Sequence, residues 1–145
     1  MQLIDTTRFD LVATVVNAKT QNVDGFDYAL QTALANQATL GIIVWVDDDE
    51  ISIFDALTPN YVTNLMAEAS HFGTDLADIA QALGVKQIKV SIQRGNNLGS
   101  IATDVYCNEF SYDLLVFEQE HHYQNQIQHA VTVVNEKLLS STMVL

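Results

Sequence analysis

The side chains best suited to chemistry in this sequence lie between Glu118 and His122. The only cluster with the residue types of a metal site contains Glu118, Glu120, His121 and His122. Adjacent histidines in an extended segment point in opposite directions, and the i, i+4 spacing that lets two helical histidines share an ion is absent. We therefore expect a solvated loop with surface histidines and no bound metal. A pH-sensing role is the alternative, because an imidazole beside a carboxylate titrates near neutrality.

A second charged stretch, Asp47-Asp48-Asp49-Glu50, is the densest run of acids in the chain. Four carboxylates can hold a hard cation, but this run lacks the alternation and the glycine of a calcium loop. We expect a solvated loop at the point where a strand leaves its sheet. Cation binding by these residues is the alternative.

No serine or cysteine of this sequence lies in a recognisable catalytic motif. Ser91, Ser140 and Ser141 have no elbow motif around them, and Gly99-Ser100 lacks the Gly-x-Ser-x-Gly frame. The lone Cys107 falls near the apolar side of a predicted helix, without a partner for a disulfide and without a neighbouring cation to lower its thiol pKa. No catalytic residue is predicted, and a small-molecule enzyme is kept only as an alternative.

Charge and composition restrict the partners of this chain. Its 145 residues include 18 acidic and 6 basic side chains, which gives a formal charge of −12. Such a field repels phosphate backbones and anionic lipid, so we expect no binding to nucleic acid or membrane. No window approaches a membrane span, and residues 1–8 lack the basic and apolar regions of a secretion signal. A cytoplasmic location is expected.

Short apolar runs alternate with helical stripes along the whole chain. The stretch 87–117 predicts a strand, a turn, a helix and a second strand, which is the pattern of a right-handed crossover between parallel strands. Gly84 is placed to end a long helix, and Thr58 is a candidate cap for its start, with Pro59 in the first turn. The predicted strands are 11–16, 39–46, 87–92, 112–117 and 142–145, and the predicted helices are 26–36, 62–83, 98–107 and 127–138.

This alternation is typical of a parallel sheet between two layers of helices. We expect one domain, residues 1–145, of the α/β class. Its architecture would be a three-layer sandwich with an open five-stranded parallel sheet and helices on both faces. The segment 51–59 would pack outside this pattern as an irregular flap.

Together these pieces resemble the universal stress protein family. The resemblance covers nearly the whole chain, and the segment 51–59 looks like that of a Gram-positive, lactic-acid-bacterial branch. It implies the strand order 3-2-1-4-5 of a Rossmann-like, adenine nucleotide alpha hydrolase-like fold. The residues that carry it are Ala29-Leu30 with Ala33, Gly41-Ile42-Ile43-Val44, Gly84-Val85, Gly95 before a helix, and Tyr112-Asp113-Leu114-Leu115-Val116.

The resemblance also implies where a ligand would bind. In such a sheet, ligands lie at the carboxyl ends of the first and fourth strands, where the order of strands reverses. Nucleotide-binding members of the family have an aspartate at the end of the first strand and a glycine-rich loop after the fourth, whose backbone N–H groups approach the phosphates. The corresponding candidate pocket contains Val16, Asn17, Val44, Phe117 and Glu118.

The nucleotide motif itself is absent. No glycine follows Gly99, Val16 or Asn17 replaces the aspartate, and the last Gly-Ser of the motif would fall near Gln128-His129. Glu118 would repel a phosphate at the place where it should bind. We therefore expect no cofactor bound through the family motif. The alternative is ATP or AMP, with or without magnesium, in a rebuilt site.

From the resemblance we expect a stress-response regulatory or interaction protein. Its partners would be an unidentified protein and a second copy of the chain. Family members commonly pair through the last strand, and an unpaired apolar edge is a liability for a free sheet. A symmetric homodimer is expected through Thr142, Met143, Val144 and Leu145.

Overall fold

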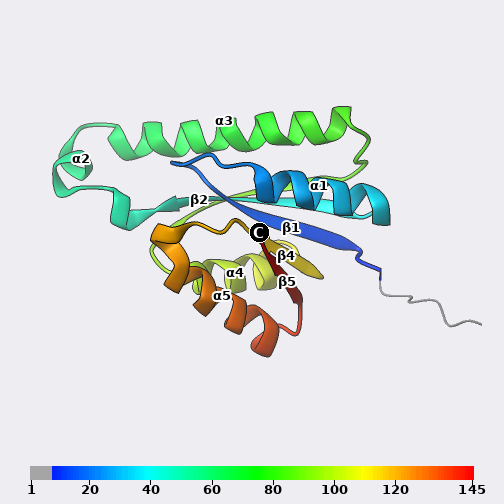
Figure 1. Ribbon diagram of the computed structural model, residues 1–145. Helices are drawn as coiled ribbons and strands as arrows, with labels where there is room; N and C mark the ends of the chain where they lie inside the picture. The colour runs from blue at the N-terminus through cyan, green and yellow to red at the C-terminus, as the bar shows by residue number, and fades with distance from the viewer. Residues whose placement is uncertain (1–7) are drawn as a thin grey trace, which may run out of the picture.

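Five parallel strands form a single sheet in the order β3-β2-β1-β4-β5 (Figure 1). The computed structural model describes residues 8–145, and the expectations for the start of the chain fall on residues 1–7, outside the described residues. The strand order implied by the resemblance is confirmed. The strands are β1 (Leu11–Asn17), β2 (Thr39–Asp47), β3 (Ile88–Gly95), β4 (Leu114–Phe117) and β5 (Ser141–Val144).

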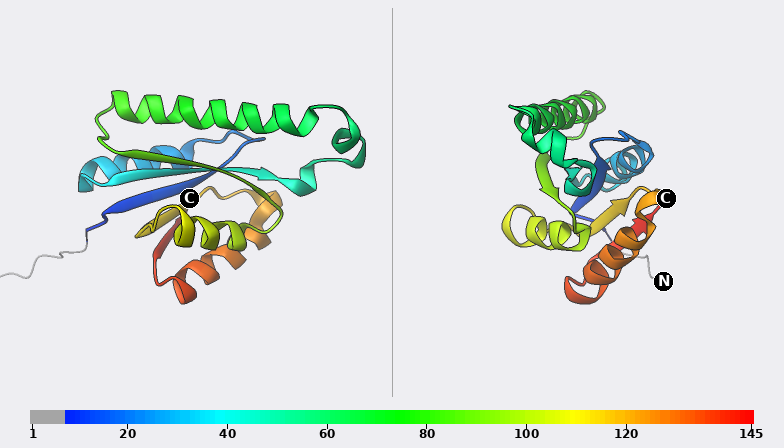
Figure 2. Two further views of the ribbon diagram at one scale, coloured as in Figure 1. Left: turned by 180° about the vertical axis from the view of Figure 1, so that it is seen from behind. Right: turned by 90° about the vertical axis from the view of Figure 1, so that its left-hand side faces the viewer.

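Helices cover both faces of the sheet. Helices α1 and α3 pack on one face, and α4 and α5 pack on the other (Figure 2). The predicted three-layer α/β sandwich is therefore confirmed. Among residues 8–145, no helix is both long and apolar enough to cross a membrane. The helices are α1 (Asp24–Asn36), α2 (Ile53–Leu57), α3 (Tyr61–Ala82), α4 (Leu98–Asn108) and α5 (Gln124–Lys137), and two 3-10 turns are η1 (Asp48–Glu50) and η2 (His121–Tyr123).

The continuous apolar runs of the central strands are explained by burial on both faces. Successive side chains of a strand point to opposite faces of the sheet. In β1, Val12 and Val16 pack under α1 and α3, whereas Ala13 and Val15 pack under α4 and α5. Each face thus has its own hydrophobic core, and a polar residue at any of these positions would be buried.

The start of α3 differs from the prediction. Thr58 and Pro59 do not begin this helix, because Thr58 ends the preceding helix α2 and its hydroxyl donates to the Phe54 carbonyl at 2.9 Å. Asn60 then turns the chain in the left-handed region, at a φ of 64°, before α3 begins. The segment expected to be an irregular flap contains α2, which Ser52 caps by accepting the Asp55 N–H at 3.0 Å. The sequence did not predict α2, because a single-turn helix is too short to show a periodic pattern.

Two further predictions concern helix ends and faces. Gly84 follows the end of α3 with a φ of +112°, so the predicted termination by glycine is confirmed. Cys107, by contrast, is exposed and does not lie near the apolar face of α4. The packed face of α4 is formed by Ile101, Ala102 and Val105. A residue two positions after Val105 lies on the opposite side of a helix with 3.6 residues per turn.

Candidate functional site

The candidate site lies at the carboxyl ends of β1 and β4, which are neighbours in the sheet. The chain leaves β1 toward α1 on one face and leaves β4 toward α5 on the other face (Figure 1). This is the topological switch point of an open α/β sheet, where the two departing segments leave a crevice. Asn17 ends β1, and Phe117 and Glu118 end β4 and begin the next loop.

The chain's own aromatic side chains fill most of this crevice. The rings of Trp45 and Tyr123 meet edge to face with their centroids 5.0 Å apart, and the two residues are only 2% and 6% exposed. Trp45 Nε1 also donates to the Gly95 carbonyl at 2.9 Å. The cavity that remains has a volume of about 10 Å³, which is about the space of one water molecule. It is lined by Val15, Asn17, Trp45, Leu98, Phe117, Glu118, Glu120 and Ile127.

Glu118 occupies the N-terminus of α1. One oxygen of its carboxylate accepts the backbone N–H of Gly25 in the first turn of this helix, which has no side-chain cap of its own. The free N–H groups and the dipole of a helix N-terminus favour a negative charge there. A Cβ on Gly25 would lie 2.8 Å from Glu118 Oε2, so the glycine permits this close approach. Burial raises the pKa of Glu118, and the Gly25 N–H opposes that rise.

Asn17 connects the loops that follow β1 and β4. Its Oδ1 accepts the backbone N–H of Lys19 at 2.8 Å and that of Thr20 at 3.4 Å. Its Nδ2 donates to Glu120 Oε2 at 3.4 Å, and the Thr20 hydroxyl donates to Glu120 Oε1 at 2.5 Å. Both polar ends of Asn17 are thus engaged within the protein. Asn17 therefore holds the two loops together at the edge of the cavity.

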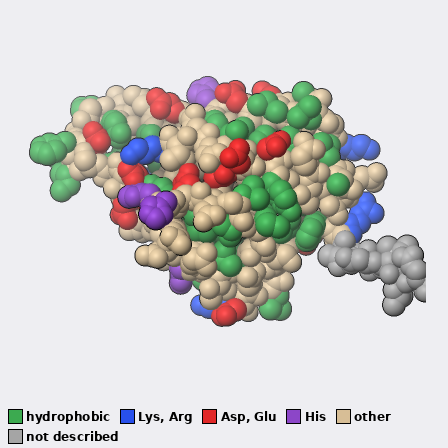
Figure 3. All heavy atoms as spheres, viewed as in Figure 1, with side chains coloured by type: hydrophobic (Ala, Val, Ile, Leu, Met, Phe, Trp, Pro, Cys, Tyr) green, Lys and Arg blue, Asp and Glu red, His purple; other side chains and the backbone are tan. Residues whose placement is uncertain are grey.

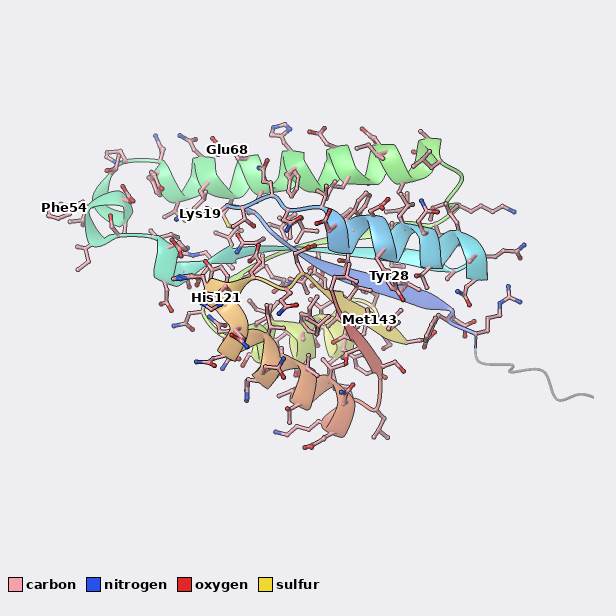
Figure 4. All side chains as sticks on the ribbon, in the orientation of Figure 1. Lys19, Tyr28, Phe54, Glu68, His121 and Met143 are labelled. Atoms are coloured by element: carbon pink, nitrogen blue, oxygen red, sulfur yellow. The ribbon has the colours of Figure 1, made fainter. Side chains whose placement is uncertain are left out.

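Glu50 is the centre of a second polar network at the same edge of the sheet. Its carboxylate forms an ion pair with Lys19 Nζ at 2.6 Å and accepts the Tyr123 hydroxyl at 2.8 Å. His122 Nε2 lies 3.4 Å from Glu50 Oε1. The hydrogen bond from Lys19 is the main cause that lowers the pKa of Glu50. Figure 4 shows Lys19 and the neighbouring His121 at this end of the sheet.

The acidic run 47–50 is therefore only partly the solvated loop that was expected. Asp47 belongs to β2 and is 5% exposed, and the next three residues form the turn η1. Asp48 is paired with Arg94, whose Nε lies 2.5 Å from its Oδ1. Asp47 Oδ1 accepts the Asp49 N–H at 3.0 Å and so starts the turn. Asp47 is buried because it belongs to a central strand. The run of charged residues had instead favoured the prediction of a loop.

We expect Asp47→Asn to stabilise the protein at neutral pH. Burial raises the pKa of Asp47 above its ordinary value, so between the unfolded and folded pKa values the folded state binds more protons. Stability then falls as pH rises through that window. Asparagine keeps the acceptor for the Asp49 N–H and carries no charge. Urea unfolding should show a gain of about 1 kcal/mol near pH 7 that shrinks toward about pH 4.

The exposed neighbour Asp49 provides the matched control for this change. Asp49→Asn removes the same charge from the same turn without relieving a buried carboxylate, so its effect should stay within about 0.5 kcal/mol. A loss of stability in Asp47→Asn at neutral pH would contradict the view that the buried, ionised carboxylate of Asp47 destabilises the fold.

The structure brings together three of the five predicted pocket residues. Asn17, Phe117 and Glu118 line the small cavity. Val16 and Val44 are 0% exposed and pack under α1 and α3, away from the cavity. Ligand binding by any of the five stays a prediction. Sequence reasoning did not assign three residues that shape the site, and the signal for them was their place at strand ends or in polar loops: Lys19, Trp45 and Tyr123. It named Glu50 only as part of the acidic run 47–50.

The two adjacent histidines lie in a short turn beside Tyr123. His121 and His122 lie in the turn η2, and His122 also packs edge to face on Tyr123 with ring centroids 4.8 Å apart. Within residues 8–145, no group of three or more His, Cys, Asp or Glu side chains is arranged to hold a metal ion. Cation binding at 47–50 or at the two histidines stays untested.

Comparisons with known proteins show the fold of this chain. Neither a protein-family model nor a curated protein sequence matches it. Among solved structures, universal stress protein UspA from Lactobacillus plantarum is similar over 97% of this chain and 99% of its own, with 19% identity and a TM-score of 0.67. A universal stress protein family member from Burkholderia pseudomallei covers 94% and 95%, with 13% identity and a TM-score of 0.70. A universal stress protein in complex with cAMP covers 96% and 98%, with 15% identity and a TM-score of 0.65. The chain thus has the fold of the universal stress proteins.

Proposed function

We propose that this chain is a cytoplasmic, universal-stress-protein-like regulatory domain that acts through protein contacts and binds no adenine nucleotide at its switch point. One observation carries the proposal: the carboxylate of Glu118 occupies the N-terminus of α1, beside a cavity of only about 10 Å³. The stress-response role rests on the similarity of fold. The loss of nucleotide binding rests on the side chains of this chain.

Space is the first obstacle to a nucleotide. Pockets for small ligands commonly have volumes of about 300–1,000 Å³, far above the space found here. An adenine ring could enter only if Trp45 or Tyr123 left the place where their rings pack on each other. Such a movement would expose aromatic surface and would free the Trp45 N–H from the Gly95 carbonyl. Both changes cost free energy before any contact with a ligand is made.

Charge is the second obstacle. Glu118 and Glu120 both line the cavity, and their carboxylates accept the Gly25 N–H and the Thr20 hydroxyl. A phosphate would have to replace Glu118 at the helix N-terminus and would still lie near two negative charges. Like charges at such distances repel strongly where water is excluded. The chain thus supplies its own anion at the place that could otherwise receive one.

A rebuilt nucleotide site is the second candidate. It is favoured by the universal stress protein in complex with cAMP, whose fold matches at a TM-score of 0.65. In that case Glu118 would swing away from Gly25 and the aromatic pair would open. Binding would then be coupled to a rearrangement, and the ligand's apparent affinity would be lowered by the rarity of the open state.

Calorimetric titration with AMP, cAMP and ATP plus magnesium tests the proposal. We expect no saturable heat with the wild-type protein and no nucleotide in the small molecules released from it on denaturation. Glu118→Gln removes one charge and keeps the volume of the side chain, so it should also remain silent because the cavity stays filled. Saturable binding by the wild-type protein would overturn the proposal in favour of the rebuilt site. Binding by Glu118→Gln alone would show that charge, and not space, excludes the nucleotide.

The proposed homodimer uses the free edge of β5. Within the described part of the chain this strand pairs only with β4, and Ser141 and Leu145 donate their N–H groups to the β4 side at 3.0 and 3.1 Å. Because backbone directions alternate along a strand, the N–H of Thr142 points away from β4 and toward the free edge. A second copy can pair there, which would satisfy this donor.

Thr142→Pro should therefore convert the dimer into a folded monomer. Proline removes the outward N–H, and it is tolerated on edge strands at positions that do not donate to the sheet. Thr142→Val is the matched control, because both changes remove the hydroxyl that donates to Asn135 at 3.1 Å but only proline removes the backbone donor. Light scattering at micromolar concentration should give a dimer for the wild type and for Thr142→Val. A monomeric wild type, or a dimeric Thr142→Pro, would rule out pairing through β5.

A further inference from the structure

Helix α2 presents an apolar surface that no part of the chain between residues 8 and 145 covers. Ile53, Phe54 and Leu57 are 77%, 83% and 76% exposed, and α2 has no buried residue. Figure 1 shows α2 projecting past the end of the sheet, and Figure 4 shows Phe54 pointing away from the rest of the chain. Leu57 follows Ile53 by four residues and Phe54 by three, and both spacings place side chains next to each other on a helix, so the three form one contact surface. Packing within residues 8–145 does not explain them, and exposed apolar clusters mark interaction sites.

A cavity of about 420 Å³ lies at the opposite edge of the sheet. It is formed where α1 and α3 end and where the chain enters β2 and β3, which is the amino edge, whereas α2 follows the carboxyl end of β2. Its volume is within the range of pockets that bury small groups, and much of its wall is aliphatic. The residues that line it are Ala33, Leu34, Gln37, Ala38, Thr39, Gly84, Val85, Lys86 and Gln87.

The two features carry opposite charge. Asp55 is part of α2 and Asp49 closely precedes it, and within residues 8–145 neither takes part in an ion pair. Of the described residues that line the cavity, Lys86 is the one that carries a charge. Arg8 lies beside it and donates to the carbonyl of Asn36 at 3.0 and 3.1 Å. Figure 3 shows the apolar cluster at one end of the molecule and basic side chains both at the other end and close to the cluster. The basic side chains near α2 are Lys19 and Arg94, which are already paired with Glu50 and Asp48.

We propose that α2 of one copy docks into this cavity of a second copy. The donor and acceptor surfaces lie on opposite edges of the sheet, so the contact is head to tail and repeats along a row of copies. It differs from the pairing of β5 edges, which is symmetric. A symmetric contact between two α2 helices would place Asp49 and Asp55 against their equivalents, whereas docking into the cavity brings Asp55 toward Lys86.

The small size of the contact predicts weak association. Three apolar side chains and one cavity fall well below the ~800 Å² that each partner buries in a standard interface. We expect a dissociation constant of about 0.1–1 mM for isolated copies. Copies that are already held together, as in a β5-linked dimer, would join into longer rows at lower concentration, because several contacts act together.

Sedimentation equilibrium provides the first test. The average mass of wild-type protein should rise beyond that of the dimer between about 10 µM and about 1 mM. Phe54→Ser and Lys86→Glu should each raise the dissociation constant of this contact at least about tenfold. Asp55→Lys combined with Lys86→Glu should restore the wild-type value. Val23→Ser is the matched control, because Val23 is also exposed, at 39%, but lies before α1, outside both surfaces. Absence of the rise, or a rise that survives Phe54→Ser, would overturn the proposal.

Disulfide trapping provides a second test that does not depend on affinity alone. In a Cys107→Ser background, copies carrying Ala56→Cys, an exposed position of α2 that leaves Phe54 in place, are mixed with copies carrying Gln37→Cys, at the wall of the cavity. Disulfides form only when the two Cα atoms come within about 7 Å of each other. We expect a product that joins the two populations, and none when Gln128→Cys on α5 replaces Gln37→Cys. No product, or an equal yield with Gln128→Cys, would mean that the cavity takes a different occupant.

Discussion

Trp45→Ala should lower the free energy of unfolding by about 3–5 kcal/mol. Trp45 is the largest fully buried side chain and packs between the sheet and Tyr123 at the switch point. Its removal leaves a void and an unsatisfied Gly95 carbonyl, which now accepts the indole N–H at 2.9 Å. A loss of this size is a large fraction of the 5–15 kcal/mol that stabilises a typical domain. Urea unfolding followed by far-ultraviolet circular dichroism would measure it, since the variant has no tryptophan for fluorescence.

The same variant should regain stability when indole is added. Cavities left by large-to-small changes in an apolar site bind molecules of the missing shape, and a ligand that binds only the folded state stabilises it. Phe117→Leu is a suitable control, because it also shortens an aromatic side chain in the wall of the site without leaving the shape of an indole. If indole stabilised both variants equally, or neither, Trp45 would not be the group that fills the crevice.

Gly41→Ala should cost about 2–3 kcal/mol, which is unusual for the addition of one methyl group. A Cβ at this position would lie 2.6 Å from Cε2 of Phe110 and 3.0 Å from its Cζ. Gly41 cannot move away, because β2 pairs with β1 on one side and with β3 on the other. Phe110 is itself 6% exposed and held in the core under α4 and α5. The strain therefore falls on a buried aromatic ring.

A double-mutant cycle separates this clash from a general preference for glycine. Phe110→Leu removes the ring atoms that meet the new methyl group, so it should cost stability by itself but recover part of the loss in the Gly41→Ala background. Coupling of about 1 kcal/mol or more is expected for residues in direct contact. Additive effects, measured by the same urea unfolding, would show that contact with Phe110 is not what makes a glycine necessary at position 41.

The layered fold could be predicted because it depends on local periodicity. Apolar runs such as 11–16 and 39–46 need cover on both faces, and stripes such as 62–83 have one apolar side, so their alternation leads to a parallel sheet between helices. The single-turn helix α2 was not predicted, because one turn is too short to show a period. The order of the strands came from the resemblance, since periodicity alone does not order strands.

The sequence by itself determined the strands, the long helices, the end of α3 at Gly84 and the absence of the nucleotide motif. Only the tertiary structure decided what fills the switch point instead. Glu118 meets Gly25 across 93 residues of chain, and Tyr123 reaches Glu50 across 73. Local patterns state whether a residue belongs to a strand, a helix or a loop. They do not state which distant backbone group a carboxylate will meet, because that depends on which loops the packing of helices on the sheet brings together.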